Sequence, residues 1–189
     1  VDPDSHMSAE LYANLLRQGF RRSGPYVYRP ACPSCSACQS LRIPVAEFEG
    51  SRRHRRNWRH NADLRVIPRD AEFDSEHFRL YRDYIAWRHP GGSMDDPTPQ
   101  GYRHFLLAPW CPTTFYEFRL GDELLAVAVT DVLPDALSAV YTFFRPDLHK
   151  RGLGTYAVQW QMKRARELGM THLYLGYWIA DCAKMRYKA

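Results

Sequence analysis

Residues 141–178 read YTFFRPDLHKRGLGTYAVQWQMKRARELGMTHLYLGYW, and they predict a strand, a basic loop with glycines, a helix and a second strand. The strand before the loop is rich in β-branched and aromatic residues and ends before Pro146. Apolar residues then recur at helical spacing up to Gly169, and residues 172–178 alternate in the manner of a strand. A glycine loop that opens a helix presents unpaired backbone N–H groups at the positive end of the helix dipole, so the segment predicts an anion-binding site.

Two more strands precede this segment and set the fold class. Residues 113–120 and 123–132 flank a Gly-Asp turn and predict a hairpin, and a Pro-Asp turn then leads into residues 136–144. A meander followed by a helix and one more strand predicts an α+β fold in which helices flank a central, mostly antiparallel sheet. For the remaining chain, the same signals predict strands at residues 26–29, 41–48 and 64–68 and helices at residues 8–20, 74–88 and 99–107.

The composition predicts a globular protein of the cytoplasm. The 189 residues are 45% hydrophobic, and no run approaches the roughly 18 consecutive apolar residues of a membrane span. No secretory signal opens the sequence, and an odd count of five cysteines does not suit a disulfide framework. We therefore expect reduced thiols, a cytoplasmic location and no membrane partner, and the net charge of +5 favours an anionic partner.

Three cysteines stand close together in a loop that contains prolines and small residues. Cys32, Cys35 and Cys38 form C-x-x-C-x-x-C, a spacing that lets three thiolates meet at one zinc ion or iron–sulfur cluster. A tetrahedral site needs a fourth ligand, for which Cys111, Cys182, a histidine or a segment outside this sequence is a candidate. The alternative is that the three residues are reduced thiols without a ligand.

A run of basic residues follows the cysteine loop. Ser51–Asn61 reads SRRHRRNWRHN and contains no acidic residue. On a helix, four of its arginines would share one face, namely Arg52, Arg55, Arg56 and Arg59. A solvated charged helix normally mixes both signs of charge, whereas planar guanidinium groups beside one tryptophan suit a nucleic-acid backbone. We favour nucleic-acid binding over a merely solvated face.

The loop before the helix fits two phosphate-binding patterns. His149, Gly152 and Gly154 form H-x-x-G-x-G, which resembles the pyrophosphate loop of the GNAT acyltransferase superfamily, written Q/R-x-x-G-x-G/A. His149 departs from the first position of that pattern. Gly152, Gly154 and Ala157 also satisfy the dinucleotide fingerprint G-x-G-x-x-A, but the acidic residue that would hold a ribose does not follow the next strand.

Six segments together resemble the bacterial aspartate/glutamate leucyltransferases, relatives of the arginyl-tRNA-protein transferases. In collinear order they are RQGFRRSGPYVYRPACPSCSAC at 17–38, LRIPVAEF at 41–48, the arginine run, DVLPDALSAVYTFFRPD at 131–147, GTY at 154–156 and HLYLGYWI at 172–179. The resemblance implies a GNAT-like fold with a small N-terminal cysteine-containing lobe. It also implies an enzyme that moves leucine, or arginine in the eukaryotic branch, from charged tRNA onto proteins that begin with Asp or Glu, which creates an N-degron.

The resemblance extends over nearly the whole chain from about residue 8 and implies a domain organisation. Residues 1–7 read VDPDSHM and look like a cloning remnant. Residues 8–62 would form the N-terminal lobe and the arginine-rich helix, and residues 63–189 the GNAT-like transferase domain. Members of the family usually extend beyond both ends of this sequence, so we expect the transferase domain to be truncated at its C-terminus.

Such a transfer needs mainly the positioning of two substrates. The attack of an α-amine on an aminoacyl ester is downhill, and an α-amine with a pKa of about 7.7 to 8.0 is partly neutral near pH 7. Backbone N–H groups can hold the developing oxyanion, a tyrosine can protonate the leaving ribose oxygen, and a carboxylate can anchor the amine or act as its base. No cofactor is expected for catalysis. The candidate catalytic residues are Tyr141, Tyr174, Tyr177 and Asp131.

Basic residues are the candidates for binding both substrates. A fixed arginine would recognise the carboxylate of the acceptor, and the candidates are Arg42, Arg145 and Arg186. The four arginines of the basic run would contact the acceptor stem of the tRNA; the contacts expected at its aminoacylated end are Lys150, Arg151, Gly152 and Gly154. Two other functions stay open: an acyl-coenzyme A dependent N-acetyltransferase, and a zinc-containing RNA-binding module without enzymatic activity.

Overall fold

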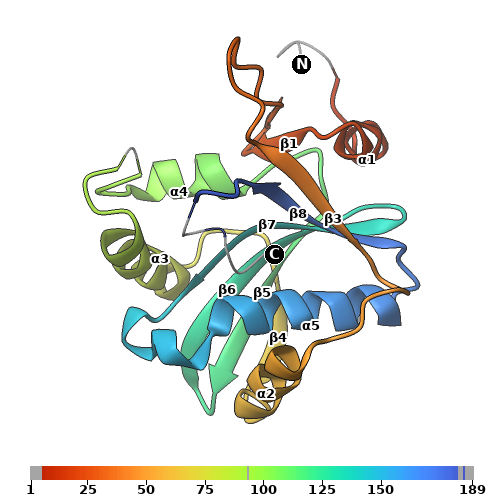
Figure 1. Cartoon of the computed structure of the whole chain (residues 1–189). Helices are drawn as coiled ribbons and strands as arrows, with labels where there is room; N and C mark the ends of the chain where they lie inside the picture. The colour runs from red at the N-terminus through yellow and green to blue at the C-terminus, as the bar shows by residue number, and fades with distance from the viewer. Residues whose placement is uncertain (1–5, 93, 183–184, 186–189) are drawn as a thin grey trace.

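The computed structural model describes residues 6–92, 94–182 and 185. It is built around a six-stranded sheet, whose arrangement is drawn in Figure 1. The strand order is β3-β8-β7-β6-β5-β4, and every neighbouring pair is antiparallel except β7 and β8. The predicted α+β fold with a mostly antiparallel sheet is confirmed. The strands of this sheet are β3 (Gln39–Pro44), β4 (Arg65–Asp70), β5 (Thr113–Leu120), β6 (Glu123–Val132), β7 (Ala136–Phe144) and β8 (His172–Trp178), and a separate hairpin pairs β1 (Arg21–Ser23) with β2 (Tyr26–Tyr28).

The predicted helices are confirmed, and side chains cap the N-terminal ends of all of them except the helix that follows Gly152. Ser8 accepts a hydrogen bond from the N–H of Leu11 (3.2 Å), and Asp74 accepts from the N–H groups of Glu76 (2.8 Å) and His77 (2.9 Å). The α-helices of the described residues are α1 (Ala9–Arg17), α2 (Arg52–His60), α3 (Ser75–Arg88), α4 (Pro99–Leu106) and α5 (Leu153–Glu167).

Helices cover both faces of the sheet. Adjacent residues of a strand point to opposite faces, so each strand has side chains to bury on both sides. On one face, α3 and α4 cover Phe115, Val127 and Phe143. On the other, α5 packs over Tyr116 and Ala128, and α2 lies against α5 (Figure 1). Within the described residues, no helix is both long and apolar enough to cross a membrane.

The N-terminal part of the chain is joined to the sheet. β3 is an edge strand beside β8, and α2 packs on α5. The β1–β2 hairpin carries two arginines into the interior, where Arg21 and Arg22 are 6% and 5% exposed. Arg21 donates to Ser138 Oγ (3.1 Å) and to the carbonyl of Ala139 (2.8 Å). The segment before the cysteine loop is therefore anchored on β7, in the middle of the sheet.

β7 and β8 separate after a short parallel contact. Their pairing covers Ala136–Ser138 of β7 against His172–Tyr174 of β8. Arg21 lies at the point of separation, and Gly176 gives it room, since a Cβ there would be 3.3 Å from Arg21 Nε. The gap between the two strands opens beyond this point.

The basic segment before α5 is more regular than the sequence predicts. Instead of an open loop, Pro146–Arg151 forms a 3-10 helix, η1, which ends at Gly152 with φ +66° and ψ 40°. Pro146 pre-sets φ in the first turn, and the N–H of Gly152 donates to the carbonyl of His149 (3.1 Å). Glycine adopts this left-handed conformation without a steric penalty, and the chain can then turn into α5.

Candidate active site

A cavity of 390 Å³ lies in the gap between β7 and β8. Residues 139–142 and 144 of β7 line one side, and Leu175 of β8 stands opposite. The C-terminal end of α3 and the first turn of α5 complete the wall. The other lining residues are Tyr84, Arg88, His89, Gly152, Gly154, Thr155, Val158, Cys182 and Met185. Because the strands are apart here, a substrate can lie between them.

Two glycines bring the first turn of α5 close to its neighbours. A Cβ on Gly152 would lie 2.7 Å from Asn57 Nδ2, and a Cβ on Gly154 would lie 3.4 Å from the Phe144 ring. Asn57 donates to the carbonyls of Arg151 (2.9 Å) and Gly152 (3.2 Å), which fixes the turn. No acidic side chain lies in the first turn of α5 and no side chain caps it, so its positive dipole end faces the cavity.

Tyr141 is the predicted catalytic residue that the structure places at the cavity. Its Oη lies 3.4 Å from Nε2 of His89, the residue that caps the C-terminal end of α3. Edge-to-face contacts with Tyr84 and Phe105 hold the Tyr141 ring. The sequence carries no signal for His89 in this role, because nothing in its spacing connects it to a strand 52 residues further along the chain.

The two other candidate tyrosines bind the N-terminal segment to β8. Tyr174 is 4% exposed and packs in an apolar cluster with Tyr12 and Ala136. Tyr177 donates from its Oη to the carbonyl of Gly19 (2.7 Å). Neither tyrosine is among the described residues that line the cavity.

Asp131 is enclosed in a buried ion pair. Arg22 places Nη2 2.6 Å from Oδ1 and Nε 2.7 Å from Oδ2, and both side chains are 0% exposed. Thr113 Oγ1 donates to the same carboxylate (2.8 Å). Burial lowers the pKa of Arg22, but the hydrogen bond and charge of Asp131 outweigh burial and leave this pKa raised. Shielded from solvent, this carboxylate holds the β1–β2 hairpin on β6. The role of Asp131 as anchor or base for the incoming amine stays a prediction from the sequence.

The arginine run forms α2, as the helical interpretation predicts. Ser51 caps it in a reciprocal capping box, and Trp58 packs on Tyr156 of α5 with ring centroids 5.1 Å apart. The half-buried side of the helix carries Asn57 and Trp58 toward α5. All four predicted tRNA-binding arginines are exposed: Arg52, Arg55, Arg56 and Arg59.

The two basic residues before Gly152 have different surroundings. Lys150 is exposed. Arg151 turns toward the end of α2, where it donates to Asn61 Oδ1 (3.0 Å) and lies 2.5 Å from Asp63 Oδ1. Arg151 therefore links η1 to α2, whereas Lys150 remains at the surface.

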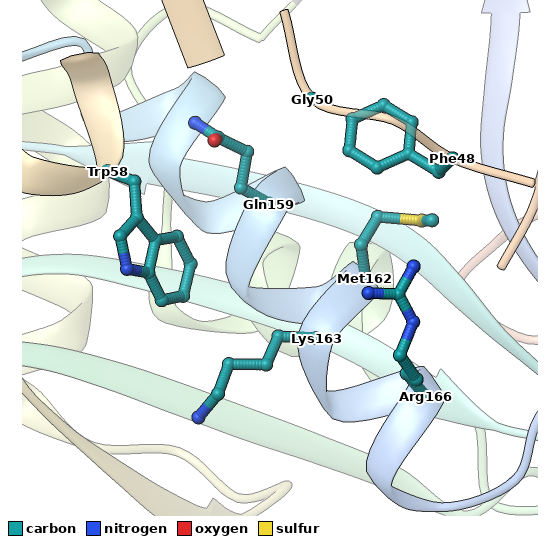
Figure 2. A pocket seen from close by; sticks show the side chains of 7 residues that line it. All are labelled: Phe48, Gly50, Trp58, Gln159, Met162, Lys163 and Arg166. Carbon is teal, nitrogen blue, oxygen red and sulfur yellow. The ribbon is translucent and has the colours of Figure 1, made fainter. Parts of the chain in front are cut away.

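A groove of 250 Å³ lies beside the arginine helix (Figure 2). Trp58 of α2 stands on one side, and Phe48 of the linker that precedes α2 stands on the other. Lys163 and Arg166 project from α5 along the same groove, and Arg166 also donates to the carbonyl of Val45 (2.8 Å). Aromatic and cationic groups thus continue from α2 onto α5.

The predicted acceptor arginines lie elsewhere than the cavity, as far as the structure describes them. Arg42 is exposed on the edge strand β3, and Arg145 pairs with Asp147 and Glu123. Arg186 lies outside the described residues. The cavity is instead lined by Arg88, which is not among the arginines predicted from the sequence. Its position as the last residue of a helix, before the turn-rich HPGGSMDD segment, is the signal that could have singled it out.

The three cysteines of the C-x-x-C-x-x-C motif are not gathered into a metal site. Cys32 and Cys35 are exposed and Cys38 is half-buried, and the N–H of Cys35 donates to the carbonyl of Cys32 (3.4 Å). In the part of the chain that the structure describes, no three Cys, His, Asp or Glu side chains are placed to hold a metal ion. A zinc ion or an iron–sulfur cluster at these cysteines therefore stays a prediction from their spacing.

The N-terminal and C-terminal parts of the chain match two models of the same protein family. The family model "Arginine-tRNA-protein transferase, N terminus" matches residues 1–56, and its C-terminal counterpart matches residues 76–189. An aspartate/glutamate leucyltransferase of Alkalilimnicola ehrlichii is 56% identical over 190 residues, which cover 100% of this chain and 80% of that protein. The corresponding protein of Halorhodospira halophila is 59% identical and is covered over 81% of its length.

Solved structures with the same fold have little sequence in common with this chain. The C-terminal domain of a protein assigned as a lysylphosphatidylglycerol synthetase from Agrobacterium fabrum matches with a TM-score of 0.57 at 14% identity, over 89% of this chain and 52% of the other. FemX matches with a TM-score of 0.57 at 11% identity, over 92% of this chain and 61% of the other. The fold is GNAT-like, as predicted. With its sequence relatives, the chain belongs to the aspartate/glutamate leucyltransferases of the arginine-tRNA-protein transferase family.

Proposed function

We propose that the cavity between β7 and β8 is where this chain transfers leucine from leucyl-tRNA to the N-terminal Asp or Glu of an acceptor protein. One observation carries the assignment of the site. The cavity is open between two separated strands and receives the first turn of α5, while the exposed arginines of α2 lie on the same side of the sheet as α5. One ligand with a long anionic body and a small reactive end suits both features.

The chemistry asks mainly for the alignment of an amine and an ester. When the enzyme holds the amine beside the ester carbonyl, a bimolecular encounter in solution becomes an attack within one bound complex. The N–H groups at the start of α5 are donors for the developing oxyanion. Tyr141 is the proton donor for the leaving ribose oxygen, since its hydroxyl is at the cavity wall.

The tRNA is proposed to lie across α2 and α5. The arginines of α2 contact its phosphates, and the groove beside Trp58 adds Lys163 and Arg166 to the same basic surface (Figure 2). Lys150 contacts the phosphates nearest the aminoacylated end. Such contacts recognise backbone and shape rather than base sequence.

Salt dependence of tRNA binding tests this surface. Replacing Arg52, Arg55, Arg56 and Arg59 with Ala should reduce the slope of log K against log salt by about 3, because each lost phosphate contact removes roughly 0.7 to 0.9. A smaller matched comparison sets Arg55→Ala/Arg59→Ala against Arg79→Ala/Arg82→Ala, which removes two exposed arginines of α3 on the opposite face of the sheet. Equal slopes for the two double variants would remove α2 from the tRNA surface.

The activity itself is tested by transfer of labelled leucine. The protein is incubated with leucyl-tRNA or arginyl-tRNA and a peptide that begins with Asp, and we expect label on the peptide from leucyl-tRNA. Tight tRNA binding without transfer would favour an RNA-binding module, and calorimetric binding of acetyl-coenzyme A would favour an N-acetyltransferase. We place the reaction in the cytoplasm, where charged tRNA is available, and its product would be a protein marked for degradation by an N-terminal leucine.

A further inference from the structure

α3 ends at the cavity with Arg88, and the next residue, His89, caps the helix. The N–H of His89 donates to the carbonyl of Ile85 (2.8 Å), and its own carbonyl accepts from the N–H of Gly92 (3.1 Å). Both basic side chains are partly buried, and both line the cavity. The end of one helix thus holds two groups of different chemistry at the same wall.

Arg88 and His89 differ in chemical type from the other described residues that line the cavity. Arg88 is the one permanent cation there and His89 the one imidazole, and none of these lining residues is Asp or Glu. The other ionisable groups of the lining are the hydroxyls of Tyr84 and Tyr141 and the thiol of Cys182. The wall therefore presents one guanidinium group, which can pair with a carboxylate, and one imidazole, whose nitrogen can accept a proton.

We propose that Arg88 and His89 form the acceptor site of the transferase. Arg88 pairs with the side-chain carboxylate of the N-terminal Asp or Glu, and His89 takes a proton from its α-amine. The inference rests on the proposed leucyl transfer in this cavity and adds the residues that select and activate its acceptor.

The setting of Arg88 favours a carboxylate over an amide. Its guanidinium lies beside Tyr84, whose pKa is raised by burial while Arg88 acts in the opposite direction, and 5.8 Å from the ring centre of Trp87. A charge pair that is partly removed from water is stronger than one at the surface. An acceptor that begins with Asn or Gln would bring no negative charge to this cation, so Arg88 separates acidic from amide N-termini.

The His89–Tyr141 contact completes the movement of protons. As the amine nitrogen bonds to the ester carbonyl carbon, one amine proton passes to Nε2 of His89. As the carbon–oxygen bond to the ribose breaks, the Oη of Tyr141 gives its proton to the departing oxygen. Transfer of the His89 proton to the Tyr141 phenolate restores both residues, and the net result is one proton moved from the amine to the ribose hydroxyl. The contact of 3.4 Å is long, as catalytic hydrogen bonds often are before substrate binds.

The first experiment measures acceptor selection. With leucyl-tRNA saturating, kcat/KM is compared for peptides that begin with Asp and with Asn. Arg88→Gln should lower the Asp value about tenfold to a hundredfold, the loss of one charged hydrogen-bonded contact, and should leave the Asn value and tRNA binding unchanged. The matched control is Arg82→Gln, an exposed arginine on the same helix. Undiminished preference for Asp in Arg88→Gln would overturn the role of Arg88.

The second experiment measures proton transfer. His89→Ala should lower kcat by a factor of about 10² to 10⁴ without weakening tRNA binding, and added imidazole should restore part of the rate. Loss of rate without imidazole rescue, or a rate within about threefold of wild type, would overturn the role of His89; His89→Gln must show the same loss. Wild-type protein is assayed alongside, so absence of transfer there would refute the proposed function itself, whereas failure confined to the variants would refute the acceptor site.

Discussion

Asp131→Asn should destabilise the fold by about 3 to 5 kcal/mol, because it leaves the guanidinium of Arg22 buried without its counter-charge. Both side chains are 0% exposed, and they are joined by two hydrogen bonds of 2.6 and 2.7 Å. For a chain of this size, about 2 to 4 °C of melting temperature accompanies each kcal/mol, so the loss corresponds to about 6 to 20 °C.

The assay compares melting temperature and urea unfolding with transfer activity measured well below the melting point. The control is Asp135→Asn, which removes the partner of Arg17 from a pair of 2.7 Å whose side chains are 45% and 42% exposed. An exposed pair contributes at most about 1 kcal/mol, so the control should melt within a few degrees of wild type. The double variant Arg22→Met/Asp131→Leu should regain part of the stability lost in Asp131→Asn, because it removes both charges.

One result would refute this reasoning. If Asp131→Asn melted like wild type and yet lost transfer, Asp131 would act on the substrate amine, as the sequence first suggested. If it melted far below wild type and retained transfer while folded, the carboxylate would be structural.

Two further predictions concern side chains outside the active site. Burial raises the pKa of Glu117, but hydrogen bonds from Arg119 and a buried histidine outweigh burial and hold this pKa at about 2, against an ordinary 4.5. About 3 kcal/mol of folding stability should therefore be lost as the pH falls from about 4.5 toward 2. Glu117→Gln should flatten this pH dependence when acid unfolding is measured. Cys32 and Cys35 are exposed and should react quickly with a thiol reagent. Cys111 should react slowly, because burial and a neighbouring carboxylate raise its pKa to about 12. If Cys32 and Cys35 reacted quickly only after a chelator had been added, with one equivalent of metal released, the result would instead support the predicted metal site.

Local patterns in the sequence determined the elements and much of their order. Caps such as Ser8 and Asp74, the Gly-Asp turn of the hairpin and the alternation in β8 depend on residues a few positions apart, so they can be read along the chain. The glycine that precedes α5 is also explained locally, because Gly152 has a φ of +66°, a left-handed backbone conformation that favours glycine.

Only the tertiary structure decided which charged groups are free to act. Arg22 is followed by no acidic neighbour in sequence, yet it is buried because Asp131, 109 residues away, meets it inside the fold. The same long-range packing brings His89, at the C-terminal cap of α3, to Tyr141 of β7 and separates both from Tyr174. Burial and pairing across the sheet depend on positions that folding makes adjacent, and spacing along the chain does not carry that information.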